Sequence, residues 1–293
     1  MLRAALILAT GFALVPLGLP STGGKISGAA LAQAQAPVGL PAIKHTQLME
    51  ALRLRDIIEV VAAEGIAAGP EIEADMFPGR GGFGWQVELE RIYDIPRVMG
   101  IMADDIQANL SEADADVLIS FLGSPLGARI VEGEVSARAA MLDPEVDEAA
   151  FAVAQDMRKA GGTRVAQISE FIAIYDLVTS NVVGGLNSNY AFYQGLAAGG
   201  ALPDAMTEDQ IVNEVWSQQD AIQIETEDWL YAYLLASYSD LSDDEMQTYI
   251  AFARTDAAQA FNAVLFDSFG TVFTSISRSL GRAVADRMLA QDI

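Results

Sequence analysis

LSEADADVLISFLGSPLGARI, residues 110–130, is the stretch that decides the fold class. Ser111 is followed three residues later by Asp114, a pairing typical of a helix start because the hydroxyl caps a backbone N–H of the first turn. Ser124 then precedes Pro125, which puts a second cap before a proline at the first helical position. The stretch therefore predicts a short amphipathic helix, a turn and a longer helix.

The same pattern occurs a second time. Residues 241–261, LSDDEMQTYIAFARTDAAQAF, align with the first stretch without gaps at an offset of 131. Ser242 then matches Ser111, and Phe252 matches Phe121. Self-similarity at a fixed spacing is typical of a duplicated structural unit. We therefore expect an internal repeat.

The rest of the chain also has helical periodicity. Leu54, Ile57, Ile58 and Val61 fall at i, i+3, i+4 and i+7, and no convincing run of alternating β-branched residues is present. The sequence therefore predicts an all-α fold of two related multi-helix units, a helical bundle or helical repeat without a β-sheet. The predicted parts are a first helical unit at 44–142, a connecting helix at 143–162 and a second helical unit at 163–293.

The N-terminus resembles a secretory signal. Arg3 precedes an apolar run from Ala4 to Leu19, and a small-residue segment follows in which Ala32 and Ala34 end A-x-A signal peptidase patterns. We predict a periplasmic protein; the alternative is an inner-membrane anchor formed by an uncleaved signal, for which the run is short. The predicted segments are a signal peptide at 1–34 and a loose leader at 35–43.

Charge and composition exclude several function classes. Removing Arg3 and Lys25 with the signal leaves 15 of the 17 basic residues against all 40 acidic ones, a net charge of −25. Such a chain repels nucleic acid and anionic membrane surfaces, so neither is an expected partner. The absence of cysteine excludes disulfides, thiolate zinc sites and a cysteine nucleophile. No later segment is apolar enough to predict a membrane span in the mature chain.

A glycine-rich stretch, PGRGGFGW at residues 78–85, fits the G-x-G-x-x-G pattern of dinucleotide-binding loops. That fingerprint works only between a strand and a helix, and the preceding GPEIEADMF does not read as a buried strand. We expect a connection into a helix that begins near Trp85. An anion site or hinge remains the functional alternative. Its residues would be Arg80, Gly81, Gly82 and Trp85.

Catalytic and metal-binding patterns are weak. His45 is the only histidine and lacks the partners of a triad or a histidine metal site, so neither a metal nor a cofactor is predicted. Glu88, Glu90 and Asp94 surround a helix that Pro96 is expected to kink. A buried pair among these acids could act as general acid and base in a glycosidase.

Two further clusters have a structural and a functional interpretation. Arg278, Arg282 and Arg287 complement the dipole at the end of the last helix, or they dock an acidic partner or the other unit. A dense group of aromatic residues is expected to pack in the core, or to line a groove for a peptide or lipid. Its members are Trp216, Trp229, Tyr231, Tyr233 and Tyr238.

The repeated pattern resembles the bacterial domain-of-unknown-function family two-zero-five-nine, apparently in two tandem copies with the second degenerate. The second copy departs at Asp256 and Ala258, where the pattern has Pro and Gly. The resemblance implies an exported, all-helical envelope protein and implies no activity. Its carriers are Ser111, Ile119, Phe121, Ser124, Pro125 and Gly127 in the first copy, and Ser242, Ile250, Phe252 and Thr255 in the second.

Three functions are compatible with these features. The first is a non-catalytic binding or protein-interaction module of the cell envelope, whose partner is another envelope protein or a small apolar ligand. The second is an envelope hydrolase that acts on glycan or peptide through carboxylates, and the third is a structural subunit. An enzyme requires two acids in one cleft, one with a raised pKa, whereas a binding module requires a groove or exposed patch between helices.

Overall fold

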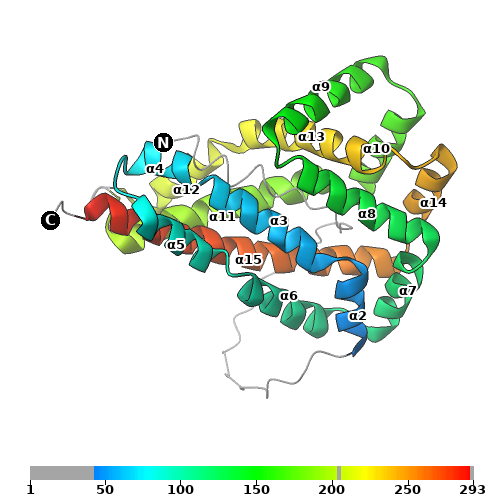
Figure 1. Cartoon of the computed structure of the whole chain (residues 1–293), viewed down its shortest axis with the longest axis horizontal. Helices are drawn as coiled ribbons and strands as arrows, with labels where there is room; N and C mark the ends of the chain where they lie inside the picture. Colours follow the sequence, from blue (N-terminus) through cyan, green and yellow to red (C-terminus); the bar gives the residue numbers. More distant parts are fainter. Residues whose placement is uncertain (1–42, 203–205, 291–293) are drawn as a thin grey trace.

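The computed structural model describes residues 43–202 and 206–290, and these residues form helices and no strand. The fold is all-α, as the sequence predicts (Figure 1). The predicted signal, with Ala32 and Ala34, and most of the leader lie outside the described residues. The helices are α2 Ile43–Ala51, α3 Leu54–Ala67, α4 Gly69–Met76, α5 Gly82–Ile92, α6 Ile95–Asn109, α7 Glu112–Leu122, α8 Pro125–Ala140, α9 Pro144–Ala160, α10 Thr163–Ile174, α11 Leu177–Gly199, α12 Glu208–Trp216, α13 Gln219–Ser237, α14 Asp243–Ala253 and α15 Asp256–Leu289.

Helices begin where the sequence places caps. The Ser111 hydroxyl accepts a hydrogen bond from the Asp114 N–H, and Ser124 accepts one from Gly127 N–H at the start of α8. Ser242 caps α14 in the same way and forms a reciprocal capping box with Glu245. Each cap satisfies a backbone donor that the first helical turn leaves without a partner.

The longest helix, α15, has 34 residues and crosses the molecule (Figure 1). It packs in parallel against α11, and small residues allow a close approach. A Cβ on Gly281 would lie 2.1 Å from the Phe192 carbonyl oxygen, and one on Gly195 would lie 2.3 Å from that of Arg278. Helix backbones approach this closely only where side chains are absent.

Most of the other helices join one core, whereas α12 packs against α11 in a smaller cluster of its own. Helices α5, α6 and α7 pack against α15, while α8 and α9 pack against α13. One continuous cluster of buried side chains extends from Leu48 in α2 to Ala285 in α15. Residues of both predicted units contribute to it, and the Phe121 and Phe252 rings stack with centroids 3.6 Å apart. The predicted connecting segment is helix α9, which lies along α13.

One local prediction is wrong. The segment around Pro96 is two helices and not a single kinked one, because α5 ends at Ile92 and α6 begins at Ile95. The Asp94 side chain accepts a hydrogen bond from the Arg97 N–H, and Pro96 lies in the first turn of α6, where its missing N–H has no helical partner to lose. Among the described helices, none combines the length and apolar character that crossing a bilayer requires.

Candidate binding groove between α11 and α15

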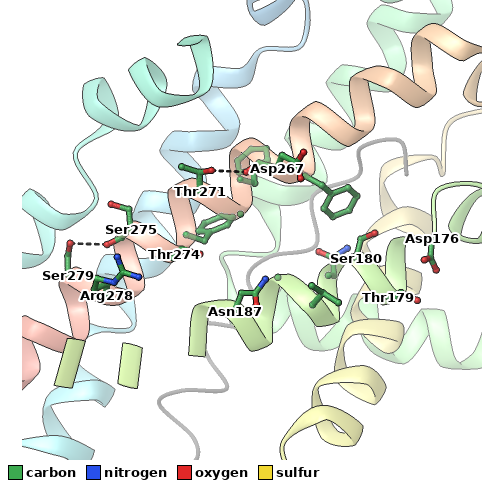
Figure 2. A pocket seen from close by; sticks show the side chains of 17 residues that line it. Asp176, Thr179, Ser180, Asn187, Asp267, Thr271, Thr274, Ser275, Arg278 and Ser279 are labelled. Carbon is green, nitrogen blue, oxygen red and sulfur yellow. Dashed lines mark hydrogen bonds between the residues drawn. The ribbon is translucent and has the colours of Figure 1, made fainter. Parts of the chain in front are cut away.

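A groove of about 930 Å³ separates the N-terminal part of α11 from the middle of α15 (Figure 2). The two helices are in tight backbone contact further along, at Gly195 and Gly281, and the groove lies beside the N-terminal part of α11. Its volume is within the range of small-molecule sites in proteins. It is lined by Asp176, Thr179, Ser180, Asn181, Val183, Gly184 and Asn187 from α11 and its cap, and by Phe266, Asp267, Phe269, Gly270, Thr271, Phe273, Thr274, Ser275, Arg278 and Ser279 from α15.

Asn181 is the one lining amide that is buried, with 4% of the residue exposed. Its Nδ2 donates to the Leu177 carbonyl oxygen at 2.7 Å, one helical turn earlier. Its Oδ1 has no hydrogen-bond partner among the described residues. A buried acceptor without a donor costs free energy, typically about 1–3 kcal/mol. A ligand that supplies an N–H or O–H would satisfy it.

Two glycines of the groove have no packing reason within the described part of the chain. No described atom lies within 4 Å of a Cβ built on Gly184 or Gly270. Glycine in a helix interior costs about 1 kcal/mol relative to alanine, and at Gly195 and Gly281 close helix contact explains that cost. At Gly184 and Gly270 the missing side chains leave room for another molecule to approach the backbone.

Aromatic and charged side chains both line the groove along α15. Phe266, Phe269 and Phe273 form an aromatic row on α15, and the last two rings stack at 5.6 Å between centroids. Asp176 and Asp267 lie toward one end of the groove and Arg278 toward the other (Figure 2). Arg278 donates to the Gln194 side chain at 2.8 Å. The arrangement is suited to binding and contains no pair of acid and base in contact.

A second cluster of interest surrounds Glu134 on α8. This half-buried carboxylate accepts hydrogen bonds from the hydroxyls of Tyr238, at 2.6 Å, and Tyr249, at 3.3 Å. Burial raises the pKa of Glu134 to about 7, although both tyrosine hydrogen bonds act in the opposite direction. The Tyr233 hydroxyl donates to the Glu134 carbonyl oxygen, and the buried Tyr175 hydroxyl has no partner among the described residues.

One turn further along α8, the buried Arg138 forms an ion pair with Glu64 of α3. The Arg138 guanidinium also lies over the Trp229 ring, 4.8 Å from its centroid. Burial raises the pKa of the Glu64 carboxyl, and the charge of Arg138 acts in the opposite direction. This cluster joins α3, α8 and α13 and is best explained as a structural contact.

The glycine-rich loop does not present a free anion site. The Gly81 N–H donates to the Glu73 carboxylate at 2.9 Å, so an acid of the chain itself occupies the position that a bound anion would take. Arg287 donates to the carbonyl oxygens of Arg80 and Gly81. α5 begins at Gly82, earlier than the start near Trp85 that the sequence predicts. The loop is held in place by Glu73 and by the end of α15.

The side chains beside this loop are structural as well. Arg80 donates to the Met288 carbonyl oxygen, and the buried Trp85 donates from Nε1 to Gly69. Of the predicted basic cluster, Arg282 donates to the Ala198 carbonyl oxygen and Arg287 to the glycine-rich loop. Arg287 therefore contacts the other predicted unit, one of the roles expected from the sequence, whereas Arg282 contacts α11 of its own unit.

The three acids near Pro96 make local contacts with their own helices. Glu88 pairs with Arg91, which holds the pKa of that carboxyl below its usual range, and Glu90 accepts from Gln86. Asp94 is the cap of α6. No group of three or more metal-binding side chains occurs among the described residues. His45 is buried, and its Nε2 lies 3.0 Å from the Leu110 carbonyl oxygen. Its role is therefore structural.

The family-motif residues and most of the aromatic group are structural. Gly127 packs against the last turn of α7, where a Cβ would lie 2.1 Å from the Phe121 carbonyl oxygen. Trp229, Tyr233 and Tyr238 are buried in the core, whereas Trp216 is 57% exposed. The aromatic residues of the groove are instead on α15.

No family model, no curated protein and no solved structure matches this chain. The resemblance to a family of unknown function therefore stays a prediction, and the geometry of the groove carries the functional argument. No sequence pattern predicted the groove. Its available signal was the presence of Gly184 and Gly270 inside strongly helical segments, where glycine usually has a packing or functional reason.

Proposed function

We propose that this protein is an exported, non-catalytic binding module of the cell envelope, and that the groove between α11 and α15 holds a small ligand with an apolar body. The observation that carries the proposal is the buried Asn181 acceptor without a partner, beside two glycines that leave the groove open. Phenylalanines line the groove and make it apolar in part, Phe269 and Phe273 as buried side chains and Phe266 as a partly buried one.

The proposed location rests on the N-terminal sequence. An arginine, an apolar run and A-x-A patterns ending at Ala32 and Ala34 support export to the periplasm. An uncleaved signal would instead keep the protein at the inner membrane with the same helical part outside it. The strongly negative charge of the chain disfavours nucleic acid as a partner.

A carboxylate-dependent hydrolase of glycan or peptide is the alternative, and Glu134 is the observation that favours it. Its pKa of about 7 is suited to general acid–base chemistry. However, tyrosine hydroxyls from α13 and α14 contact this carboxylate, and no second carboxylate among the described residues hydrogen-bonds to the cluster. The binding function is therefore the better supported of the two.

We also propose that the chain is a duplication of one helical unit. Support comes from Arg53 and Asp176, the only non-glycine residues with positive φ in the described chain, which precede α3 and α11 at corresponding joints. The equivalent Phe121 and Phe252 stack on each other. Helix α6 packs on α15, and α13 packs on α8, so each half covers the long helix of the other.

The binding proposal is tested with Nile red, an uncharged apolar dye whose fluorescence rises in apolar surroundings. We expect saturable binding to the wild-type protein and its loss in Gly270→Leu, whose side chain fills the groove. Gly100→Leu is the matched control, because Gly100 is also a helix-interior glycine with no described atom within 4 Å of a Cβ, but on α6. Equal dye binding by both variants, or none by the wild type, would overturn the proposal.

A further inference from the structure

We infer that the groove selects a cationic amphiphile, a ligand with an amine head and an apolar body. The inference rests on the proposed binding function and adds the chemistry of the ligand. Three independent features of the groove support it: the acceptor on Asn181, the distribution of charge along the helices, and the aromatic row on α15.

Asn181 requires a donor. Because its Nδ2 is used by the Leu177 carbonyl oxygen, the group left without a partner is the acceptor Oδ1. Amines and alcohols can donate to it, whereas an ionised carboxylate cannot. A buried polar group discriminates strongly between ligands that satisfy it and ligands that leave it unpaired. The groove should therefore disfavour fatty-acid anions.

The charges of the lining favour a cation at one end. Asp176 and Asp267 lie toward the same end of the groove (Figure 2), and both are exposed. The N-terminal dipole of α11 offsets part of the charge of Asp176, but Asp267 is in the interior of α15, where this effect is absent. The net charge of −23 on the whole chain adds to the attraction for cations.

The middle of the groove accepts the apolar body. Phe269 and Phe273 lie between Asp267 and Arg278 on α15, two positions about 17 Å apart along the helix axis, and Phe266 directly precedes Asp267. Gly184 and Gly270 keep this part of the groove free of side chains. An alkyl chain or a narrow ring system therefore lies against the aromatic row while its head remains near the acids.

The test uses three probes with one tail and three heads: decylamine, decanol and decanoate. Each displaces Nile red from the wild-type protein at neutral pH and low salt, below its micelle concentration. We expect decylamine to bind at least about tenfold more tightly than decanoate, with decanol between them. The preference for the amine over decanol should shrink when salt is added, because the carboxylates are exposed.

Two substitutions separate the contributions. Asn181→Leu removes the acceptor. It should weaken the binding of decylamine and decanol by about tenfold and leave the binding of decanoate unchanged. Asp267→Asn should weaken decylamine alone, by about threefold or more. If Asn181→Leu does not fold, Asn181→Asp keeps the shape and should strengthen the preference for the amine.

The outcomes distinguish the two proposals. Loss of dye binding in Gly270→Leu together with equal affinity for amine and carboxylate would retain the binding function and overturn the selection of cations. Unchanged probe affinities in the Asn181 and Asp267 variants would likewise overturn the selection of cations and retain the binding function. If no probe displaces the dye, or if Gly270→Leu binds like wild type, the groove is not the site and both proposals fail.

Discussion

At the scale of single residues, Glu134 illustrates how position determines chemistry. The chain contains 40 acidic residues, and most of them are solvated. Glu134 differs because α8 turns it toward Tyr238 and Tyr249, which reach it from α13 and α14. Burial raises its pKa to about 7, so it changes charge in the physiological range. Its two tyrosine contacts connect residues more than 100 positions apart.

We predict that Glu134 makes stability depend on pH. Its pKa in the folded protein, about 7, is above the ordinary value of 4.5, so the ionised form is disfavoured by folding. The destabilisation is complete above pH 7 and is relieved as the pH falls toward 4.5. Relative to Glu134→Gln, the free energy of unfolding of the wild-type protein should increase by about 2 kcal/mol as the pH falls from 8 to 5. Urea unfolding across this range measures the difference, and parallel curves would contradict it.

At the scale of elements, the α11–α15 pair has two different halves. Where Gly195 faces Arg278 and Gly281 faces Phe192, the backbones are in contact. Toward the N-terminal part of α11 the two helices line the groove. The same residue type therefore has opposite roles: at Gly281 it permits contact, and at Gly184 it preserves space.

Alanine substitutions should separate these roles. Gly281→Ala places a Cβ 2.1 Å from the Phe192 carbonyl oxygen and should destabilise the protein by about 1–3 kcal/mol. Gly184→Ala meets no described atom within 4 Å and should stabilise it by up to about 1 kcal/mol through helix propensity. Thermal and urea unfolding of both variants check the signs. If both substitutions shifted the free energy of unfolding in the same direction, the two glycines would not have the opposite roles assigned to them.

At the scale of the whole molecule, the two predicted units are not separate bodies within the described residues. One core cluster includes side chains from α2 to α15, and each half packs on the long helix of the other. The stacked rings of Phe121 and Phe252 lie where the two repeated segments meet. Unfolding should therefore be a single cooperative event involving both halves.

The stacked pair allows a test of this coupling. Phe121→Ala and Phe252→Ala should each destabilise the protein by about 2–3 kcal/mol, since both side chains are partly buried. The destabilisation of the double variant should be about 1 kcal/mol smaller than the sum of the two single destabilisations, because each single change already breaks the stack. Phe83→Ala, at a side chain that is 82% exposed, is the control and should change stability little. Two separate transitions in any variant would contradict the shared core.

The sequence predicted the structure best where the interactions are local. The caps at Ser111, Ser124 and Ser242 depend on residues three positions apart, and the structure contains all three. The kink at Pro96 was a wrong prediction, because the cap formed by Asp94 makes a separate helix start more favourable. The glycine-rich loop does not offer the anion site considered from its sequence, and the reason is non-local. The Glu73 carboxylate of the preceding helix α4 accepts the hydrogen bond from the Gly81 N–H that an anion would accept.

By itself, the sequence determined the all-α class and the helix starts after Ser111, Ser124 and Ser242, because periodicity and capping act within a few turns of chain. The tertiary structure alone decided the groove, the pKa of Glu134 and the shared core. Gly195 and Gly281 meet across 86 positions, and their contact determines where α11 and α15 touch and where they separate. A pattern of neighbouring residues carries no information about such distances, since they follow from the packing of the whole chain.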